Sequence, residues 1–324
     1  MSAQGTQVGQ FGQAARPARL IGVDELKRAW YAVQAGEFRN NSGDMSVHGR
    51  PGLGAARGPR GRGVAAEKDW SPADGEHAIA VLGCAGSAGA STLALAVGLA
   101  ATTPVRVIEC CSVTASGLAA ASTAELGLHA SDWRQGKRDH VLLERASEVL
   151  AGADEVPLPT DNPHRREKAD GRAEEQSAGY GRQLTILDIG WEAGQLLATD
   201  CWLAEAVRTA DQVVLVTTAT VPGMRRAGIV MELLVNHWQP EDLHLAVRGP
   251  RRKKWPRGLE HAGGPAVRRA LDADRCVEIP EDRDLAVNGL DSRTIPAALI
   301  SASRQLLEPA DLLTDSPSAT SETA

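Results

Sequence analysis

Short apolar runs alternate with amphipathic stretches through the middle of the chain, between residues 76 and 308. Apolar runs bounded by turn residues predict buried strands, whereas apolar positions that recur every three or four residues predict helices. The predicted strands are 78–82, 105–109, 184–189, 213–216, 243–247 and 277–279. The predicted helices are 93–101, 139–150, 201–208 and 222–236. Strands separated by helices predict right-handed crossovers and therefore an α/β fold, with a mainly parallel sheet and helices on both faces.

The pattern weakens outside this region and in one stretch within it. Polar, low-complexity sequence lacks the apolar surface needed for a core, so we expect disorder or loops there. A short segment that precedes the domain is an exception, because Leu26, Trp30 and Val33 fall on one face of a predicted helix. The expected organisation is a disordered 1–17, a helical segment 18–39, a flexible Gly- and Arg-containing linker 40–75, a domain 76–308 with a polar insertion at 160–183, and a disordered acidic tail 309–324.

A glycine-rich turn joins the strand predicted at 78–82 to the helix predicted at 93–101, and it reads G-C-A-G-S-A-G-A-S-T over 83–92. Glycines let the backbone turn tightly and approach a ligand, and the start of a helix offers N–H groups to an anion. We therefore expect the turn to bind phosphates, with Ser91 or Thr92 as a magnesium ligand. The residues expected to form this site are Gly86, Ser87, Ala88, Gly89, Ala90, Ser91 and Thr92.

The turn departs from the phosphate-binding pattern G-x-x-x-x-G-K-[ST] at two positions. The first glycine falls on Cys84 and the lysine falls on Ala90. A charge pair about 4 Å apart contributes about 4 kcal/mol at an effective dielectric near 20, before desolvation is subtracted. Without compensation, its loss corresponds to roughly a thousandfold in affinity or rate. Whether an arginine of this chain or of a partner replaces the lysine is left open.

Further segments follow the turn in a consistent order. The strand predicted at 105–109 runs into E-C-C, the one at 184–189 contains Asp188, and C-V-E-I-P-E-D occupies 276–282. In this order the segments of 76–307 resemble MinD/ParA-type P-loop ATPases, and G-A-S-T at 89–92 is most similar to the CpaE-like and septum-site-determining branch. The resemblance implies ATP or ADP as cofactor, with Mg²⁺ held by Ser91 and, through water, by Asp188. It also implies a weaker metal role for Glu109 and places Pro280 beside the adenine.

The chain departs from this family where hydrolysis depends on charge. The signature lysine of the family falls on Ala85, and its catalytic aspartate falls on Cys111. Groups that neutralise and align the transferred phosphate are therefore depleted together. The resemblance implies a pseudo-ATPase or slow ATPase that acts as a positioning, partition or assembly regulator, with a protein partner and a homodimer as expected assemblies.

Two other functions compete with this interpretation. Cations and a tryptophan are concentrated at 248–257, which favours a nucleic-acid-binding accessory protein that contacts phosphates non-specifically. The residues of that surface are Arg248, Arg251, Arg252, Lys253, Lys254, Trp255 and Arg257. A dinucleotide-dependent oxidoreductase is disfavoured, because its G-x-G-x-x-G spacing differs from the glycines at 83, 86 and 89.

Composition limits the remaining classes. The net charge of −6 excludes polyanion binding by bulk charge, so any nucleic-acid contact needs a local patch. The five cysteines lack metal-site spacing and are expected to be reduced. No apolar run approaches a membrane span, and the acidic ending gives no sign of an amphipathic anchor. We therefore expect a cytoplasmic protein.

Overall fold

The computed structural model describes residues 70–73, 75–129, 133–159 and 183–308. The expectations for 1–17, 18–39, 309–324 and most of 40–75 and 160–183 lie outside these residues and stay predictions. Among the helices of the described part, none is long and apolar enough to cross a bilayer.

The described residues form one sheet with helices and short 3-10 helices between its strands. The strands are β1 (Glu76–Gly83), β2 (Val105–Cys110), β3 (Ala124–Leu128), β4 (Trp133–Arg138), β5 (Val141–Ala146), β6 (Gln183–Ile189), β7 (Gln212–Thr218), β8 (Leu243–Gly249) and β9 (Cys276–Pro280). The helices are α2 (Ala90–Ala100), α4 (Ala193–Leu197), α5 (Trp202–Thr209), α6 (Val221–His237), α7 (Leu259–Ala262), α8 (Gly264–Asp272), α9 (Arg283–Asn288) and α10 (Ala297–Arg304). The 3-10 helices are Val113–Ala115, Leu118–Ala121, Ala153–Glu155 and Arg252–Lys254.

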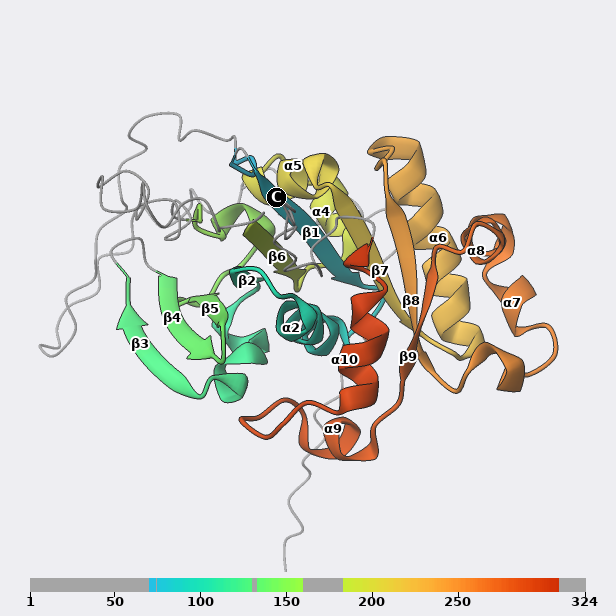
Figure 1. Cartoon of the computed structure of the whole chain (residues 1–324). Helices are drawn as coiled ribbons and strands as arrows, with labels where there is room; N and C mark the ends of the chain where they lie inside the picture. The colour runs from blue at the N-terminus through green and yellow to red at the C-terminus, as the bar shows by residue number, and fades with distance from the viewer. Residues whose placement is uncertain (1–69, 74, 130–132, 160–182, 309–324) are drawn as a thin grey trace, which may run out of the picture. The chain divides into compact units, whose positions relative to one another are not determined.

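The sheet has nine strands in the order β3-β4-β5-β2-β6-β1-β7-β8-β9. All neighbours from β5 to β9 pair in parallel, whereas β3 and β4 pair antiparallel at one edge (Figure 1). The predicted α/β fold with a mainly parallel sheet is therefore confirmed. The strands β2 and β6 lie on one side of β1, and β7, β8 and β9 lie on the other. The strand order therefore changes direction at β1, and ligands bind at such a switch point in sheets of this kind.

Helices cover both faces of the sheet, as predicted. In Figure 1, α2 and α10 lie over the near face, and α4, α5 and α6 lie behind it. Leu95 of α2 and Leu299 of α10 belong to one buried apolar cluster, whereas Leu203 of α5 and Met224 of α6 belong to the other. Each central strand contributes to both clusters, which explains why these strands read as continuous apolar runs rather than as alternating ones.

The prediction of a helix at 139–150 is wrong, because these residues form part of a hairpin. Asp139 has a left-handed φ of +51°, and the chain turns there between β4 and β5. β5 then pairs in parallel with β2 and antiparallel with β4. Leu142 and Leu143 sit within a charged stretch that resembles an amphipathic helix, but pairing on both sides favours a strand.

The apolar core also includes a residue of the segment that was predicted to be a linker. Trp70 is buried and meets Trp202 edge-on, with ring centroids 6.0 Å apart. The indole N–H of Trp202 donates to the carbonyl of Val156 at 2.7 Å. The packed domain therefore includes Trp70, upstream of the boundary expected at residue 76.

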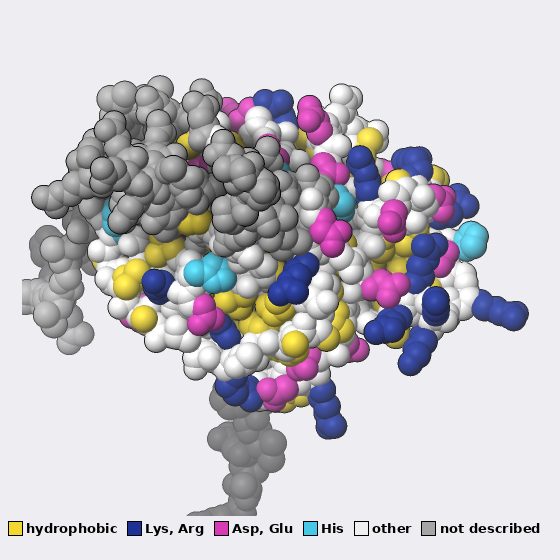
Figure 2. Space-filling model, viewed as in Figure 1, with side chains coloured by type: hydrophobic (Ala, Val, Ile, Leu, Met, Phe, Trp, Pro, Cys, Tyr) yellow, Lys and Arg dark blue, Asp and Glu magenta, His cyan; other side chains and the backbone are white. Residues whose placement is uncertain are grey.

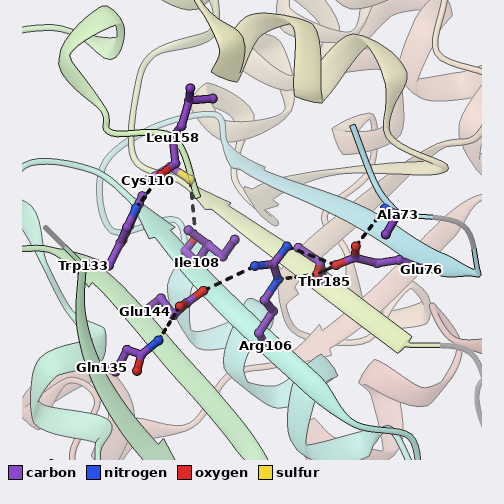
Figure 3. A network of polar contacts seen from close by, with 10 residues as sticks. All are labelled: Ala73, Glu76, Arg106, Ile108, Cys110, Trp133, Gln135, Glu144, Leu158 and Thr185. Atoms are coloured by element: carbon purple, nitrogen blue, oxygen red, sulfur yellow. Dashed lines mark hydrogen bonds and ion pairs between the residues drawn. The ribbon is translucent and has the colours of Figure 1, made fainter. Parts of the chain in front are cut away.

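A polar network joins the central strands at the opposite end from the glycine-rich turn (Figure 3). Arg106 of β2 is 1% exposed; it donates to Thr185 Oγ1 of β6 at 2.8 Å and to Glu76 Oε1 of β1 at 3.2 Å. Its Nη1 lies 3.7 Å from Glu144 Oε2 of β5, and Gln135 donates to the other oxygen of Glu144 at 2.8 Å. One guanidinium thus contacts three strands besides its own, β1, β5 and β6.

Candidate functional site

A cavity of about 620 Å³ opens at the carboxyl ends of β1, β6 and β8. The glycine-rich turn forms one wall, and the residues that follow β6 form another. The lining residues are Gly83, Cys84, Ala85, Gly86, Ser87, Ala88, Gly89, Ala90, Ser91, Thr92, Ala115, Gly117, Asp188, Ile189, Gly190, Trp191, Glu192, Gln195, Arg248, Leu285, Ala286, Gly289 and Leu290. All seven residues of the predicted phosphate-binding turn are among them.

The turn between β1 and α2 is held by its own backbone. Cys84 N–H donates to the carbonyl of Val216 in β7 at 2.9 Å, and Ala88 N–H donates to Ala85 O at 3.2 Å. Ser87 and Gly89 have left-handed φ values of +61° and +104°. Glycine adopts the second of these without strain. The local sequence therefore folds into a compact loop that delivers the chain to the first residue of α2.

The start of α2 is available to an anion. Gly89 is its N-cap, no side chain of the described residues caps it, and its first turn carries no acidic residue. The first N–H groups of a helix lack partners within the helix and carry the positive end of its dipole. This geometry suits a phosphate or another anion.

Asp188 and Ser91 come together at the base of the cavity. Asp188 is 2% exposed near the end of β6, and Ser91 lies in the first turn of α2. The Ser91 side chain approaches the Asp188 carboxylate. Burial, and secondly the negative charge of Glu109, raise the pKa of Asp188 to about 7. A cation beside this carboxylate would favour its charged form.

The carboxylate oxygens of Glu109 accept hydrogen bonds from the protein itself, unlike those of a carboxylate that is free to bind a metal. Its two oxygens accept from the Ser116 hydroxyl at 2.5 Å, from Gly117 N–H at 2.6 Å and from Leu118 N–H at 2.9 Å. It is 1% exposed and pairs in register with Asp188 across β2 and β6. Glu109 thus anchors the loop after β2, whose Gly117 lines the cavity.

The positions of the missing charges differ in their access to the cavity. Ala85 and Ala90, where lysines were expected from the resemblance, both line it. Cys111, at the position of the expected aspartate, is 5% exposed and packs against the backbone of Gly190. Burial raises the pKa of the Cys111 thiol, with Glu109 as a further cause. Cys111 is therefore a packed thiol at neutral pH.

A further wall of the cavity comes from α9 and the residues after it. Leu285, Ala286, Gly289 and Leu290 line the cavity, whereas Pro280 ends β9 and is not among the lining residues. Asp282 caps α9 by accepting from Leu285 N–H at 2.9 Å. The sequence I-P-E-D therefore marks the approach to this wall, but the contacts come from residues that sequence reasoning did not select.

Residues after β6 also escaped sequence reasoning. Trp191, Glu192 and Gln195 line the cavity, and Glu192 caps α4 by accepting from Gln195 N–H at 3.0 Å. The indole N–H of Trp191 is buried without a hydrogen-bond partner among the described residues. No local motif marks these residues; their position directly after the strand of Asp188 is the signal that could have found them.

The cations of 248–257 divide into two groups. Arg248 lines the cavity. Arg251, Lys253, Lys254 and Arg257 are exposed, and Figure 2 shows Lys and Arg side chains gathered where α7 and α8 lie.

The other two members of this stretch hold its conformation. Arg252 pairs with Glu260 at 2.8 Å. Trp255 is partly buried against the core, and its indole N–H donates to the Pro250 carbonyl at 2.8 Å.

All five cysteines are free thiols. Burial is the main cause that raises the pKa of each of them, to about 12 for Cys84 and Cys276. Within the described residues, no group of three or more histidine, cysteine or acidic side chains could hold a metal.

No protein-family model and no curated protein matches the sequence. Among solved structures, the chain is similar to the MinC:MinD cell division protein complex of Aquifex aeolicus, with 18% identity, coverage of 72% of this chain and 96% of that chain, and a TM-score of 0.44. It is also similar to a ParA family ATPase from Chlorobium tepidum, with 13% identity, coverage of 72% and 93%, and a TM-score of 0.41. A third is the septum site-determining protein MinD complexed with Mg-ADP from Pyrococcus horikoshii, with 14% identity, coverage of 74% and 100%, and a TM-score of 0.43.

Proposed function

We propose that this chain is a nucleotide-binding protein of MinD/ParA type that binds ATP or ADP and hydrolyses ATP slowly or not at all. The observation that carries the proposal is a cavity lined by the glycine-rich turn, the uncapped start of α2 and the Ser91–Asp188 pair. Backbone N–H groups suit phosphate oxygens, and an adjacent hydroxyl and carboxylate suit Mg²⁺. Its proposed role is that of a positioning, partition or assembly regulator.

In the proposed site, the turn 86–92 holds the phosphates through backbone N–H groups. Ser91 would ligate Mg²⁺ directly, and Asp188 would hold it through water. Bound Mg²⁺ neutralises phosphate charge and orients the phosphate chain. The apolar lining residues Leu285 and Leu290 would suit the base and sugar, and Pro280 ends the strand that precedes α9.

Slow hydrolysis follows from the side chains that the site lacks. Ala85 and Ala90 offer no charge to the phosphates, and the thiol of Cys111 is packed against Gly190. Phosphoryl transfer depends on neutralising charge at the phosphates and on orienting the attacking water. A site that binds the nucleotide without these groups would act as a switch more readily than as a catalyst.

Calorimetric titration with ATP, ADP and NADH, with and without Mg²⁺, tests the proposal. We expect micromolar Mg-ATP or Mg-ADP affinity, no NADH binding, and little phosphate release from ATP. Absence of nucleotide binding up to millimolar concentrations would overturn it, and NADH binding would revive an oxidoreductase. Rapid phosphate release would refute the slow-hydrolysis part alone.

We propose that the nucleotide controls assembly into a homodimer or with a protein partner. The cavity opens at the surface, and its lining includes exposed Gly86 and Ser87. Sedimentation analysis with ATP, with ADP and without nucleotide should show an increase in mass that depends on ATP. If the protein stays a monomer in all three states, the homodimer is excluded and only assembly with a separate protein partner remains.

Non-specific DNA binding is the second candidate, and the exposed cations Arg251, Lys253, Lys254 and Arg257 favour it. None of these four pairs with a carboxylate among the described residues. Their joint replacement by alanine should abolish DNA retention and its steep decrease with salt. A control variant that removes four exposed cations elsewhere, Arg134, Lys137, Arg283 and Arg304, should retain binding. An equal loss of DNA binding in both variants would mean that binding depends on the total charge of the protein rather than on this surface.

A further inference from the structure

Arg248 occupies a fixed position at the edge of the sheet that borders the cavity. Its backbone lies between Thr218 of β7 and Ile279 of β9 in the parallel register. The carbonyl of Arg248 accepts from Ala219 N–H at 2.8 Å. Pairing on both sides and this additional bond set the direction in which the side chain leaves the sheet.

The residue after Arg248 reinforces this position. Gly249 has a left-handed φ of +147°, and a Cβ placed on it would lie 2.8 Å from the Ala219 Cβ. A larger residue would therefore push the two strand ends apart. The close contact between the ends of β7 and β8 keeps Arg248 at the cavity rather than on the exposed loop that follows.

The side chain of Arg248 reaches over the glycine that begins α2. A Cβ placed on Gly89 would lie 3.5 Å from Arg248 Cδ and 3.9 Å from its Nη1. The guanidinium thus lies beside the uncapped N–H groups of α2. Two sources of positive charge, from segments far apart in the sequence, meet at one point of the cavity wall.

Arg248 is also available to a ligand. It is half-buried, and no carboxylate of the described residues forms an ion pair with it, whereas Arg252 of the same stretch is paired with Glu260. A guanidinium stays charged at any physiological pH and can donate two parallel N–H bonds to phosphate oxygens. A half-buried cation beside a helix N-terminus therefore matches a phosphate group.

We propose that Arg248 supplies from within this chain the cationic phosphate contact that Ala85 and Ala90 cannot supply. The inference rests on the proposed function and deepens it, because it assigns ligand specificity: the site favours nucleoside di- and triphosphates over nucleosides. Arg248 acts in binding, through a charge that comes from the end of β8 instead of from the loop itself. This role separates Arg248 from the exposed cations at 251–257.

Titration of adenosine, ADP and inorganic pyrophosphate, each with Mg²⁺, into the wild type and into Arg248 variants tests the inference. Arg248→Ala should weaken ADP and pyrophosphate binding by about tenfold to a hundredfold, and leave adenosine binding unchanged. Arg248→Lys should retain most of the affinity, because the charge is kept. Arg248→Gln removes the charge but keeps a long stem over Gly89, so it decides the question if the alanine variant does not fold. Arg257→Ala, an exposed cation of the same stretch, is the matched control and should bind as the wild type does.

The outcomes separate this inference from the proposed function. If Arg248→Ala or Arg248→Gln binds ADP and pyrophosphate as the wild type does, the inference is wrong and nucleotide binding stands. If the wild type binds pyrophosphate through Arg248 but no nucleotide, the proposed function is wrong and the phosphate contact stands. If the wild type binds neither ligand, both are wrong. An equal loss for adenosine and ADP would reveal a structural role and would also overturn the inference.

Discussion

The side chain of Ser91, in the first turn of α2, approaches the buried carboxylate of Asp188 near the end of strand β6. Replacing Asp188 by asparagine keeps the shape of the side chain and an acceptor for Ser91, but removes the charge. We expect Asp188→Asn to weaken Mg-ADP binding about tenfold or more and to leave metal-free ADP nearly unaffected. Titration in magnesium and in EDTA measures both, with Glu232→Gln, a change at an exposed position of α6, as control. Equal loss in both buffers would contradict a metal role.

The raised pKa of Asp188 predicts how stability depends on pH. The folded protein holds the proton up to a pKa of about 7, whereas the unfolded chain releases it near the usual value of 3.8. Stability contributed by this group therefore falls as pH rises from about 4 to about 7 and is level above that. The full difference is on the order of 4 kcal/mol. Urea unfolding in EDTA should show Asp188→Asn gaining stability over the wild type between pH 5 and pH 8. A stability difference between the two proteins that stays constant over this pH range would contradict the raised pKa of Asp188.

Glu109 should influence both the loop after β2 and the titration of Asp188. Glu109→Ala leaves the N–H groups of Gly117 and Leu118 without their acceptor, which should lower the free energy of unfolding by about 2–4 kcal/mol. Glu109→Gln removes the negative charge beside Asp188, so the pH midpoint of the Asp188 effect should move down. Glu148→Ala, an exposed change near the end of β5, is the control for the unfolding measurement. A midpoint that stays in place would assign the shift to burial alone.

The Arg106 network predicts a large effect far from the cavity. Arg106→Ala removes the cation that Glu76 and Glu144 share, and the side chains of both are at most 2% exposed. We expect unfolding at pH 7 to become easier by about 3–5 kcal/mol. Arg134→Ala on β4, an exposed arginine, should change stability little. A small loss at pH 7 would mean that water solvates the carboxylates of Glu76 and Glu144 in the variant.

The central strands were predictable because each is buried on both faces. Val105 and Val107 point to one apolar cluster while Ile108 and Cys110 point to the other, so the strand reads as one apolar run. The edge strand β3 escaped because it is mostly exposed, with Leu126 at 57% exposure. The hairpin at Asp139 escaped because its pairing partners are distant in sequence, and local spacing favoured a helix.

The residues of the site were likewise predictable where the signal was local, and unpredictable where it depended on strands that are distant in sequence. Gly89 and Ser91 are two residues apart, at the N-cap and in the first turn of α2, so their association with the cavity followed from the local pattern. Arg248 was selected as part of a cationic stretch, but its place over Gly89 depends on the register of β8 between β7 and β9. Glu109 was selected as an acidic residue at a strand end, and only the folded loop shows that Ser116 and two N–H groups occupy its oxygens.

The raised pKa values of the five thiols make this chain suitable for site-specific labelling with a fluorescent dye. A thiol reacts as its thiolate, and raised pKa values keep all five cysteines protonated in the folded state. Val287 is 75% exposed on α9, next to Ala286 of the cavity wall. A cysteine introduced there should take up a maleimide dye much faster than the native ones. Ligand entry could then be followed by fluorescence without first removing any cysteine of the protein.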